Sequence, residues 1–225
     1  MATSPDRVRE HAPPTDRVRV RRLPERGRYD RPTIDAILDA AIIGHVGFVI
    51  DGQPYVNPTA VWRTGDRLYW HGSSASRMLR ATRDGEPVCI AVTHLDALVV
   101  ARSGFNHSVG YRSVIVLGRA WEVTDPDERL AAMEAFVEHL YPGRWAELRP
   151  PSRKELKATT ILWTELSEAS AKVRDGLPHD DPEDQSWPTW AGTVPLRTVV
   201  GEMLGDPAMP PGLAMPALSK AVFGD

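Results

Sequence analysis

Two turn signals close together in the first third of the chain constrain the fold most. Residues 51–53 and 64–66 each combine Asp and Gly between segments rich in β-branched and aromatic side chains. Asp-Gly pairs of this kind are typical of tight β-hairpin turns. Connections this short cannot support a parallel crossover, so the flanking segments must pair as an antiparallel meander. We therefore expect strands over residues 45–50, 54–63 and 67–71.

Further segments extend this pattern and place helices between strands rather than in strict alternation with them. More strands are expected over residues 87–93, 111–123 and 159–173, with residues 95–110 ambiguous. Short helices are expected after Thr33, which can cap the first one, after Asp125 and over residues 153–157. This order predicts a mainly β protein, a β-barrel with inserted helices, and not a doubly wound sheet.

The chain divides by composition into three parts. Residues 1–30 are rich in Arg and Pro and are expected to form a flexible N-terminal arm. Residues 31–176 hold the predicted strands and form the barrel domain. Residues 177–225 are rich in Pro, Gly, Leu and Met, and we expect them to pack on the barrel or on a partner subunit.

Charge and cysteine content exclude several classes of protein. The 225 residues carry a formal net charge of −3, which gives no general attraction to nucleic acid. No apolar run approaches the roughly 18 residues that cross a bilayer, and the first residues do not resemble a secretory signal. The single cysteine, Cys89, excludes an internal disulfide and a multi-cysteine metal site, and its apolar neighbours predict that it is buried. A cytoplasmic protein that binds neither membrane nor nucleic acid is expected.

The segment over residues 70–80 carries the most chemical information. A strand ends at His71, Gly72 can allow an unusual backbone angle, and hydroxyl groups and Arg77 follow where a helix begins. Serine hydroxyls, a guanidinium and unpaired amides favour a bound phosphate, although serines before a helix are often simple caps. His71 is a candidate for contact with a ligand ring or a haem, or it is purely structural.

Two weaker clusters lie further along the chain. Polar groups line the start of the strand near Tyr111, where Arg112 and Ser113 are adjacent and so face opposite sides of the strand. Lys172 and Arg174 stand at the end of the last predicted strand, where basic side chains are usually solvated. Either cluster could add to a ligand site, or neither.

Taken in order, these segments resemble the FMN-binding split-barrel family related to pyridoxamine 5′-phosphate oxidase. More narrowly, they are similar to the branch that includes nitroimidazole-resistance proteins. The matching segments are residues 33–41, 47–58, 68–78, 87–92, 111–120 and 171–174. The resemblance implies a six-stranded antiparallel Greek-key split barrel of the FMN-binding type, forming a homodimer with two FMN sites in the interface.

The resemblance also implies which residues line each FMN site. The flavin ring would lie along Pro58, Thr59, Ala60 and Val61, mainly through backbone groups. The other implied contacts come from Trp70, His71, Gly72, the phosphate-binding Ser76 and Arg77, then Tyr111, Arg112, Ser113 and Lys172. The oxidase has a second basic residue directly after the arginine, where this chain has Met78, so the phosphate charge must be balanced by other groups.

The function implied is an FMN-dependent oxidoreductase. Electrons from NAD(P)H would pass through the flavin to a small nitro compound or quinone, with His71 on the substrate side as proton donor or steric wall. Because no obligatory acid or base is evident, a non-catalytic flavin-binding or flavin-sensing module is an alternative. Members of this barrel family that bind haem, through a histidine, or a deazaflavin are further alternatives.

Overall fold

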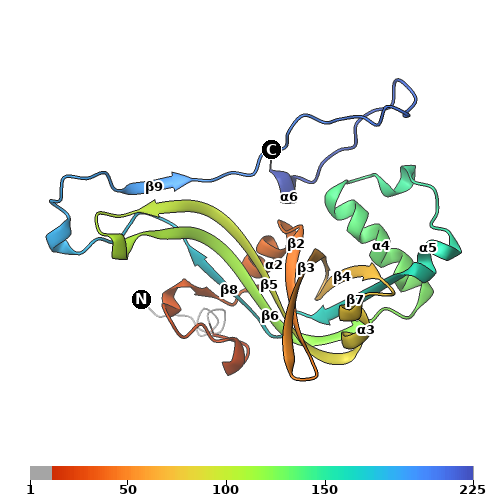
Figure 1. The fold of residues 1–225 in the computed structure, drawn as a ribbon, viewed down its shortest axis with the longest axis horizontal. Coiled ribbons are helices and arrows are strands. Elements are labelled where there is room, and N and C mark those ends of the chain that lie inside the picture. Colours follow the sequence, from red (N-terminus) through yellow and green to blue (C-terminus); the bar gives the residue numbers. More distant parts are fainter. Residues whose placement is uncertain (1–11, 225) are drawn as a thin grey trace, which may run out of the picture.

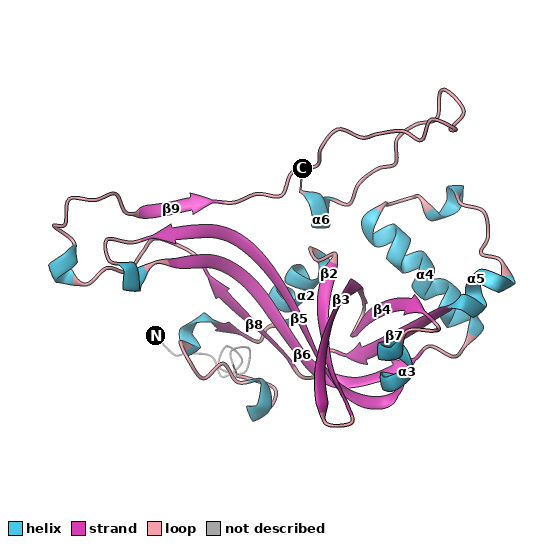
Figure 2. Cartoon of the chain, viewed as in Figure 1, coloured by secondary structure: helices cyan, strands magenta, loops and turns pink. Residues whose placement is uncertain are grey.

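The computed structural model describes residues 12–224, and antiparallel strands dominate it (Figure 2). The strands are β1 (Gly27–Arg28), β2 (Ile43–Ile50), β3 (Gln53–Thr64), β4 (Arg67–Ser73), β5 (Asp84–Val100), β6 (Ser108–Glu122), β7 (Thr159–Glu165), β8 (Ala169–Arg174) and β9 (Gly192–Pro195). The α-helices are α2 (Arg31–Asp39), α3 (Arg77–Thr82), α4 (Pro126–Leu140), α5 (Arg153–Ala158) and α6 (Lys220–Phe223).

Six of the strands close into a ring. Each neighbouring pair is antiparallel in the order β5, β2, β3, β4, β7, β6, and β6 returns to pair with β5. The turn after β2 has Asp51 and Gly52 at φ values of 51° and 77°, the left-handed pair that a type I′ hairpin requires. The structure confirms the predicted mainly β, six-stranded antiparallel barrel with inserted helices.

Two predicted strands differ from the structure. The single strand expected over residues 159–173 is two strands, β7 and β8, because β6 pairs with β8 as far as Val116 and changes to β7 at Trp121. The ambiguous residues 95–110 belong mostly to β5 and β6, which form a long hairpin that runs beyond the ring (Figure 1). That hairpin pairs with β9 along its outer edge, so tertiary pairing extends strands that local pattern left undecided.

The ring encloses the main hydrophobic core. Strand alternation sends one face of each strand inward, and α2 closes the same core with Ile34, Ile37 and Leu38. Asp30, not the predicted Thr33, caps α2: the Asp30 carboxylate accepts a hydrogen bond from the Thr33 amide. Cys89 was wrongly expected to be buried; its side chain is exposed because its neighbours Val88 and Ile90 take the inward positions.

A second, smaller core lies outside the ring under α4. Asp125 caps α4 as predicted, accepting hydrogen bonds from two amides of its first turn. The helix packs through Ala132, Met133 and Phe136 on outward-facing aromatic side chains of β3, β4 and β7. This layer, drawn on the right of Figure 1, forms one wall of the candidate site described below.

The segments before and after the barrel are held at a few points. β1 pairs with β8, and β9 pairs with β5. Residues 196–218 then form a loop that projects from the body, and it returns where the Ser219 amide bonds to the Leu140 carbonyl (Figure 1). The first 11 residues of the expected arm lie outside the described residues, and the three-part division stays a prediction. No helix within residues 12–224 is long and apolar enough to cross a membrane.

Candidate functional site

The end of β4 separates two aromatic environments. Trp70 faces the interior of the ring and is fully buried, whereas His71, the next residue, faces outward toward α4. This follows from the alternation of side chains along a strand. Of the predicted contacts in β4, Trp70 can therefore reach a ligand outside the ring only through its backbone.

His71 lies half-buried among aromatic rings. Its imidazole centroid is 5.6 Å from the Trp62 ring and 4.8 Å from the Phe136 ring of α4. Burial lowers the pKa of His71 below its usual 6.5, which favours the neutral imidazole. Two buried nitrogen atoms of this cluster, His71 Nδ1 and Trp62 Nε1, have no hydrogen-bond partner among residues 12–224.

Gly72 has a packing role rather than the conformational role expected from the sequence. Its φ is not in the left-handed region. A Cβ atom built on Gly72 would lie 3.1 Å from a methyl group of Leu79 in α3. The glycine therefore allows α3 to lie close against the end of β4, and this contact places the first residues of α3 near the strand.

The predicted phosphate-binding residues begin α3. Ser76 is the N-cap residue but its hydroxyl makes no capping bond, and Arg77 is exposed at the first helical position. The Arg77 guanidinium lies over the Tyr55 ring, 4.3 Å from its centroid. Met78 is buried in the main core, so the position of the oxidase's second basic residue faces inward here. Because α3 has only six residues, the side chains must contribute most of any attraction for phosphate.

The predicted ring-binding stretch of β3 runs from an exposed end into the core. Pro58 is exposed, Thr59 and Ala60 are half-buried, and Val61 is buried inside the ring. The Thr59 hydroxyl donates to the His71 carbonyl at 3.3 Å, which ties β3 to β4 at this point. Val61, like Trp70, is available to an outer ligand only through its backbone.

The remaining predicted residues lie elsewhere on the sheet. Arg112 forms two hydrogen bonds of 2.9 Å with Asp96, and the Ser113 hydroxyl donates to the carbonyl of Lys172. Register pairs Pro58 with His45, His45 with Ala91, and Ala91 with Ile115. Three strand steps, about 14 Å at the usual spacing, thus separate the β3 stretch from the part of β6 that holds Tyr111, Arg112 and Ser113.

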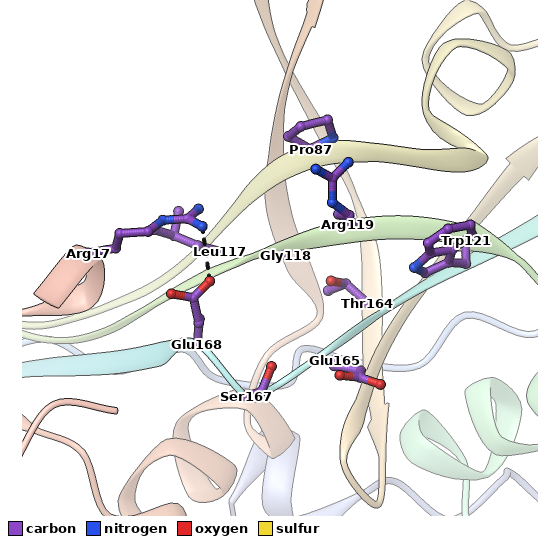
Figure 3. A pocket seen from close by; sticks show the side chains of 10 residues that line it. All are labelled: Arg17, Pro87, Leu117, Gly118, Arg119, Trp121, Thr164, Glu165, Ser167 and Glu168. Atoms are coloured by element: carbon purple, nitrogen blue, oxygen red, sulfur yellow. Dashed lines mark ion pairs between the residues drawn. The ribbon is translucent and has the colours of Figure 1, made fainter. Parts of the chain in front are cut away.

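Two cavities accompany these groups. The larger, about 1130 Å³, is lined by His94, Asp96 and Arg112 on one side and by tail residues on the other, so it includes one predicted contact. The second, about 360 Å³, opens where β6 changes partners and contains none of them (Figure 3). Three of its charged groups already have partners: Arg17 pairs with Glu168 at 3.1 Å, and Arg119 donates to the Gly85 carbonyl.

Sequence reasoning missed three aromatic residues of the site. Trp62 and Phe136 contact His71, and Tyr55 supports Arg77. Phe136 belongs to an apolar stripe of α4, and such a stripe predicts core packing. The available signal was strand alternation, which turns Trp62 outward because its neighbour Val61 faces the interior of the ring. That signal identifies a site residue only if one already knows that a helix covers the outer face.

The fold and this site define an antiparallel barrel protein with an exposed arginine and a half-buried histidine of lowered pKa on neighbouring elements. Residues 30–173 match the family model described as pyridoxamine 5′-phosphate oxidase. The chain belongs to this family, which confirms the family resemblance stated from the sequence.

Among solved structures, the flavocytochrome Anf3 from Azotobacter vinelandii is 45% identical, with a TM-score of 0.86 over 91% of this chain and 95% of that chain. The FAD and heme binding protein from Mycobacterium smegmatis is 38% identical, with a TM-score of 0.81 over 85% and 94%. A protein assigned to 5-nitroimidazole antibiotic resistance in Bacteroides thetaiotaomicron is 21% identical, with a TM-score of 0.53 over 64% and 84%, and shares the fold. No curated protein matches the sequence.

Proposed function

We propose that the protein is a redox protein that binds a flavin nucleotide and a haem. The observation that carries the proposal is the His71 cluster, where burial favours the neutral imidazole and where His71 Nδ1 and Trp62 Nε1 are buried without a partner among the described residues. Two relatives that are 45% and 38% identical are a flavocytochrome and an FAD and heme binding protein. Their names support the same pair of cofactors here.

The residues fit a haem at His71. Neutral imidazole is the form that ligates iron, and burial already favours that form in this protein. Trp62 and Phe136 supply apolar ring surface beside the imidazole. Buried polar atoms without partners are rare in folded proteins and call for an explanation. A bound haem would satisfy this cluster if it accepted a hydrogen bond from Trp62 Nε1 and if the His71 imidazole ligated its iron.

The residues also fit a flavin phosphate at the start of α3. The Ser76 hydroxyl is not used as a cap, and no carboxylate among the described residues pairs with Arg77. A guanidinium and a free hydroxyl are suitable donors to phosphate oxygens. The flavin ring would lie along the backbone of Thr59 to Val61. The sequence favours FMN as the nucleotide, and extraction of the cofactor followed by chromatography separates FMN from FAD.

We propose that the second group of predicted contacts belongs to a site shared with another chain. The three strand steps between β3 and β6 favour a homodimer in which Tyr111, Arg112, Ser113 and Lys172 approach the partner's flavin. When bound, a flavin accepts hydride or single electrons and a haem exchanges single electrons. The chain orients both groups, and its aromatic layer under α4 excludes water from the imidazole.

A reductase that uses flavin alone, with NAD(P)H as donor and a nitro compound or quinone as acceptor, is the second candidate. It would use His71 as a proton donor to the substrate. The lowered pKa disfavours that role, because a neutral imidazole has no acidic proton to give near neutral pH. The exposed start of α3 and the flavin site are the same in both candidates.

Absorption spectra of the protein, produced with added riboflavin and haem precursor, test the proposal. We expect flavin bands and a Soret band. His71→Ala should remove the Soret band and keep the flavin, whereas His107→Ala, at an exposed histidine, should keep both. The second candidate would be favoured by two results together. NAD(P)H would bleach the bound flavin, and neither variant would change a haem signal.

A charge reversal tests the phosphate site separately. Arg77→Glu should remove most of the bound flavin and leave the Soret band. Arg80→Glu makes the same charge change one turn later on the exposed face of α3, and it should retain the flavin. Equal flavin content in the two variants would contradict the role given to Arg77.

A further inference from the structure

The Arg77 side chain is held by a stack of rings that begins in the core. Phe48 of β2 is buried, and its ring stacks on Tyr55 of β3 with centroids 5.5 Å apart and planes within 18°. Phe48 and Tyr55 are register partners across the hairpin. The guanidinium of Arg77 lies over the Tyr55 ring, 4.3 Å from its centroid.

Among the ion pairs, side-chain hydrogen bonds and ring contacts of the described residues, this ring contact is the one that involves the Arg77 head group. No ion pair or side-chain hydrogen bond to Arg77 is present within residues 12–224, although the side chain is exposed. An exposed arginine normally samples many rotamers, and ordering such a side chain on binding lowers affinity. A guanidinium that rests over an aromatic ring by a cation–π contact keeps its N–H donors free for an anion.

We propose that Tyr55 is the positioning residue that presents Arg77 to the flavin phosphate, and that it thereby determines selectivity for phosphorylated flavin over riboflavin. This inference rests on the proposed flavin site. Because Met78 faces the core, Arg77 lacks the basic neighbour that the oxidase has at that position. A single guanidinium must then be well placed to hold the phosphate, and the ring of Tyr55 places it.

Flavin affinities of the cofactor-free protein test the inference through fluorescence quenching. Tyr55→Leu, which keeps apolar bulk but removes the ring, should weaken FMN binding by about threefold to tenfold. Riboflavin has no phosphate, so its affinity should change by less than about twofold in the same variant. Tyr55→Phe keeps the ring and is the matched control, with FMN affinity close to that of the natural protein.

A double-mutant cycle separates positioning from packing. In an Arg77→Ala background, Tyr55→Leu should have no further effect on FMN affinity, because the group that Tyr55 positions is absent. Equal losses for FMN and riboflavin would show that Tyr55 acts on packing alone and would overturn the inference. So would an FMN affinity that Tyr55→Leu does not change.

A second readout does not depend on the cofactor. ¹⁵N relaxation of the Arg77 Nε–H group in the cofactor-free protein should report an ordered side chain, and Tyr55→Leu should make it mobile. If no flavin binds at all, the proposed function fails while this measurement still decides whether Tyr55 orders Arg77. If FMN binds and Arg77 is equally mobile in both proteins, the inference fails and the flavin site stands.

Discussion

Gly118 lies where β6 exchanges one partner strand for another, and replacing it with alanine tests how the ring closes. Between Val116, which pairs with β8, and Trp121, which pairs with β7, the strand passes over the side chain of Thr164. A Cβ atom at position 118 would lie 2.1 Å from the Thr164 hydroxyl oxygen and 3.4 Å from its Cβ. The hydroxyl contact is about 1 Å too short for nonbonded atoms.

The size of the effect follows from the burial of Thr164. Its side chain is fully buried in β7 and borders the cavity of about 360 Å³, so Gly118→Ala must shift the backbone or turn the Thr164 side chain. Overpacking of this kind costs about 1–3 kcal/mol. The φ of Gly118 is not in the left-handed region, so no backbone strain adds to this cost. At about 2–4 °C per kcal/mol for a chain of this length, the melting temperature should fall by several degrees.

Thr164→Ala provides the decisive background. It removes the hydroxyl that clashes, and that hydroxyl has no hydrogen-bond partner in the described structure, so little stability is lost with it. Chemical denaturation followed by circular dichroism should show that Gly118→Ala costs much less in this background than alone. Gly104→Ala, at a position with nothing within 4 Å of the new methyl group, is the control and should be nearly neutral. Additive effects of the two substitutions would refute the proposed clash.

Three other measurements follow from single contacts. Burial lowers the folded-state pKa of His71 below 6.5, so the unfolded state takes up the proton first on acidification, and the free energy of unfolding should fall as the pH drops below that value. Urea denaturation at a series of pH values should show a weaker pH dependence for His71→Phe. An unchanged pH dependence would contradict the burial. Asp30→Ala removes the cap of α2 and should cost about 1 kcal/mol by thermal or chemical denaturation; no loss would mean that the cap is not used. Truncation after Leu196 removes the hydrogen bond from the Ser219 amide to the Leu140 carbonyl. It should lower the melting temperature, while the β-sheet signal in circular dichroism persists. Loss of that signal would show that the barrel needs the tail in order to fold.

The meander of β2, β3 and β4 could be predicted from sequence because its information is local. Asp51 and Gly52 specify their turn through positive φ values, and the flanking residues favour strands. The division between β7 and β8 could not be predicted, since residues 166–168 contain neither Gly nor Pro. That division is set by the point at which β6 changes partners, which is a property of the closed ring.

The candidate site was predictable to the extent that residue type alone implies chemistry. The sequence predicts a phosphate site over residues 70–80 because a histidine and an arginine flank a run of serines there. The supporting aromatic residues were not predictable, because Tyr55, Trp62 and Phe136 each have a place in strand or helix patterns that core packing explains equally well. Only the tertiary structure puts two of them around His71 and the third under Arg77.

The distribution of the predicted contacts over the ring has a consequence for the assembly. Backbone groups of β3 and the start of α3 lie on one side, and the β6 residues lie three register steps away across β2 and β5. A flavin with its ring along β3 and its phosphate at Arg77 is engaged at both ends, so we do not expect it to extend across β2 and β5 to the β6 residues. Either the β6 residues have no ligand role, or a second copy presents them. Arg112→Ala in both chains tests the first case, because flavin content should fall only if the β6 residues have a ligand role. If it falls, a mixed dimer of an Arg112→Ala chain with an Arg77→Glu chain should keep one intact flavin site when each site draws on both chains.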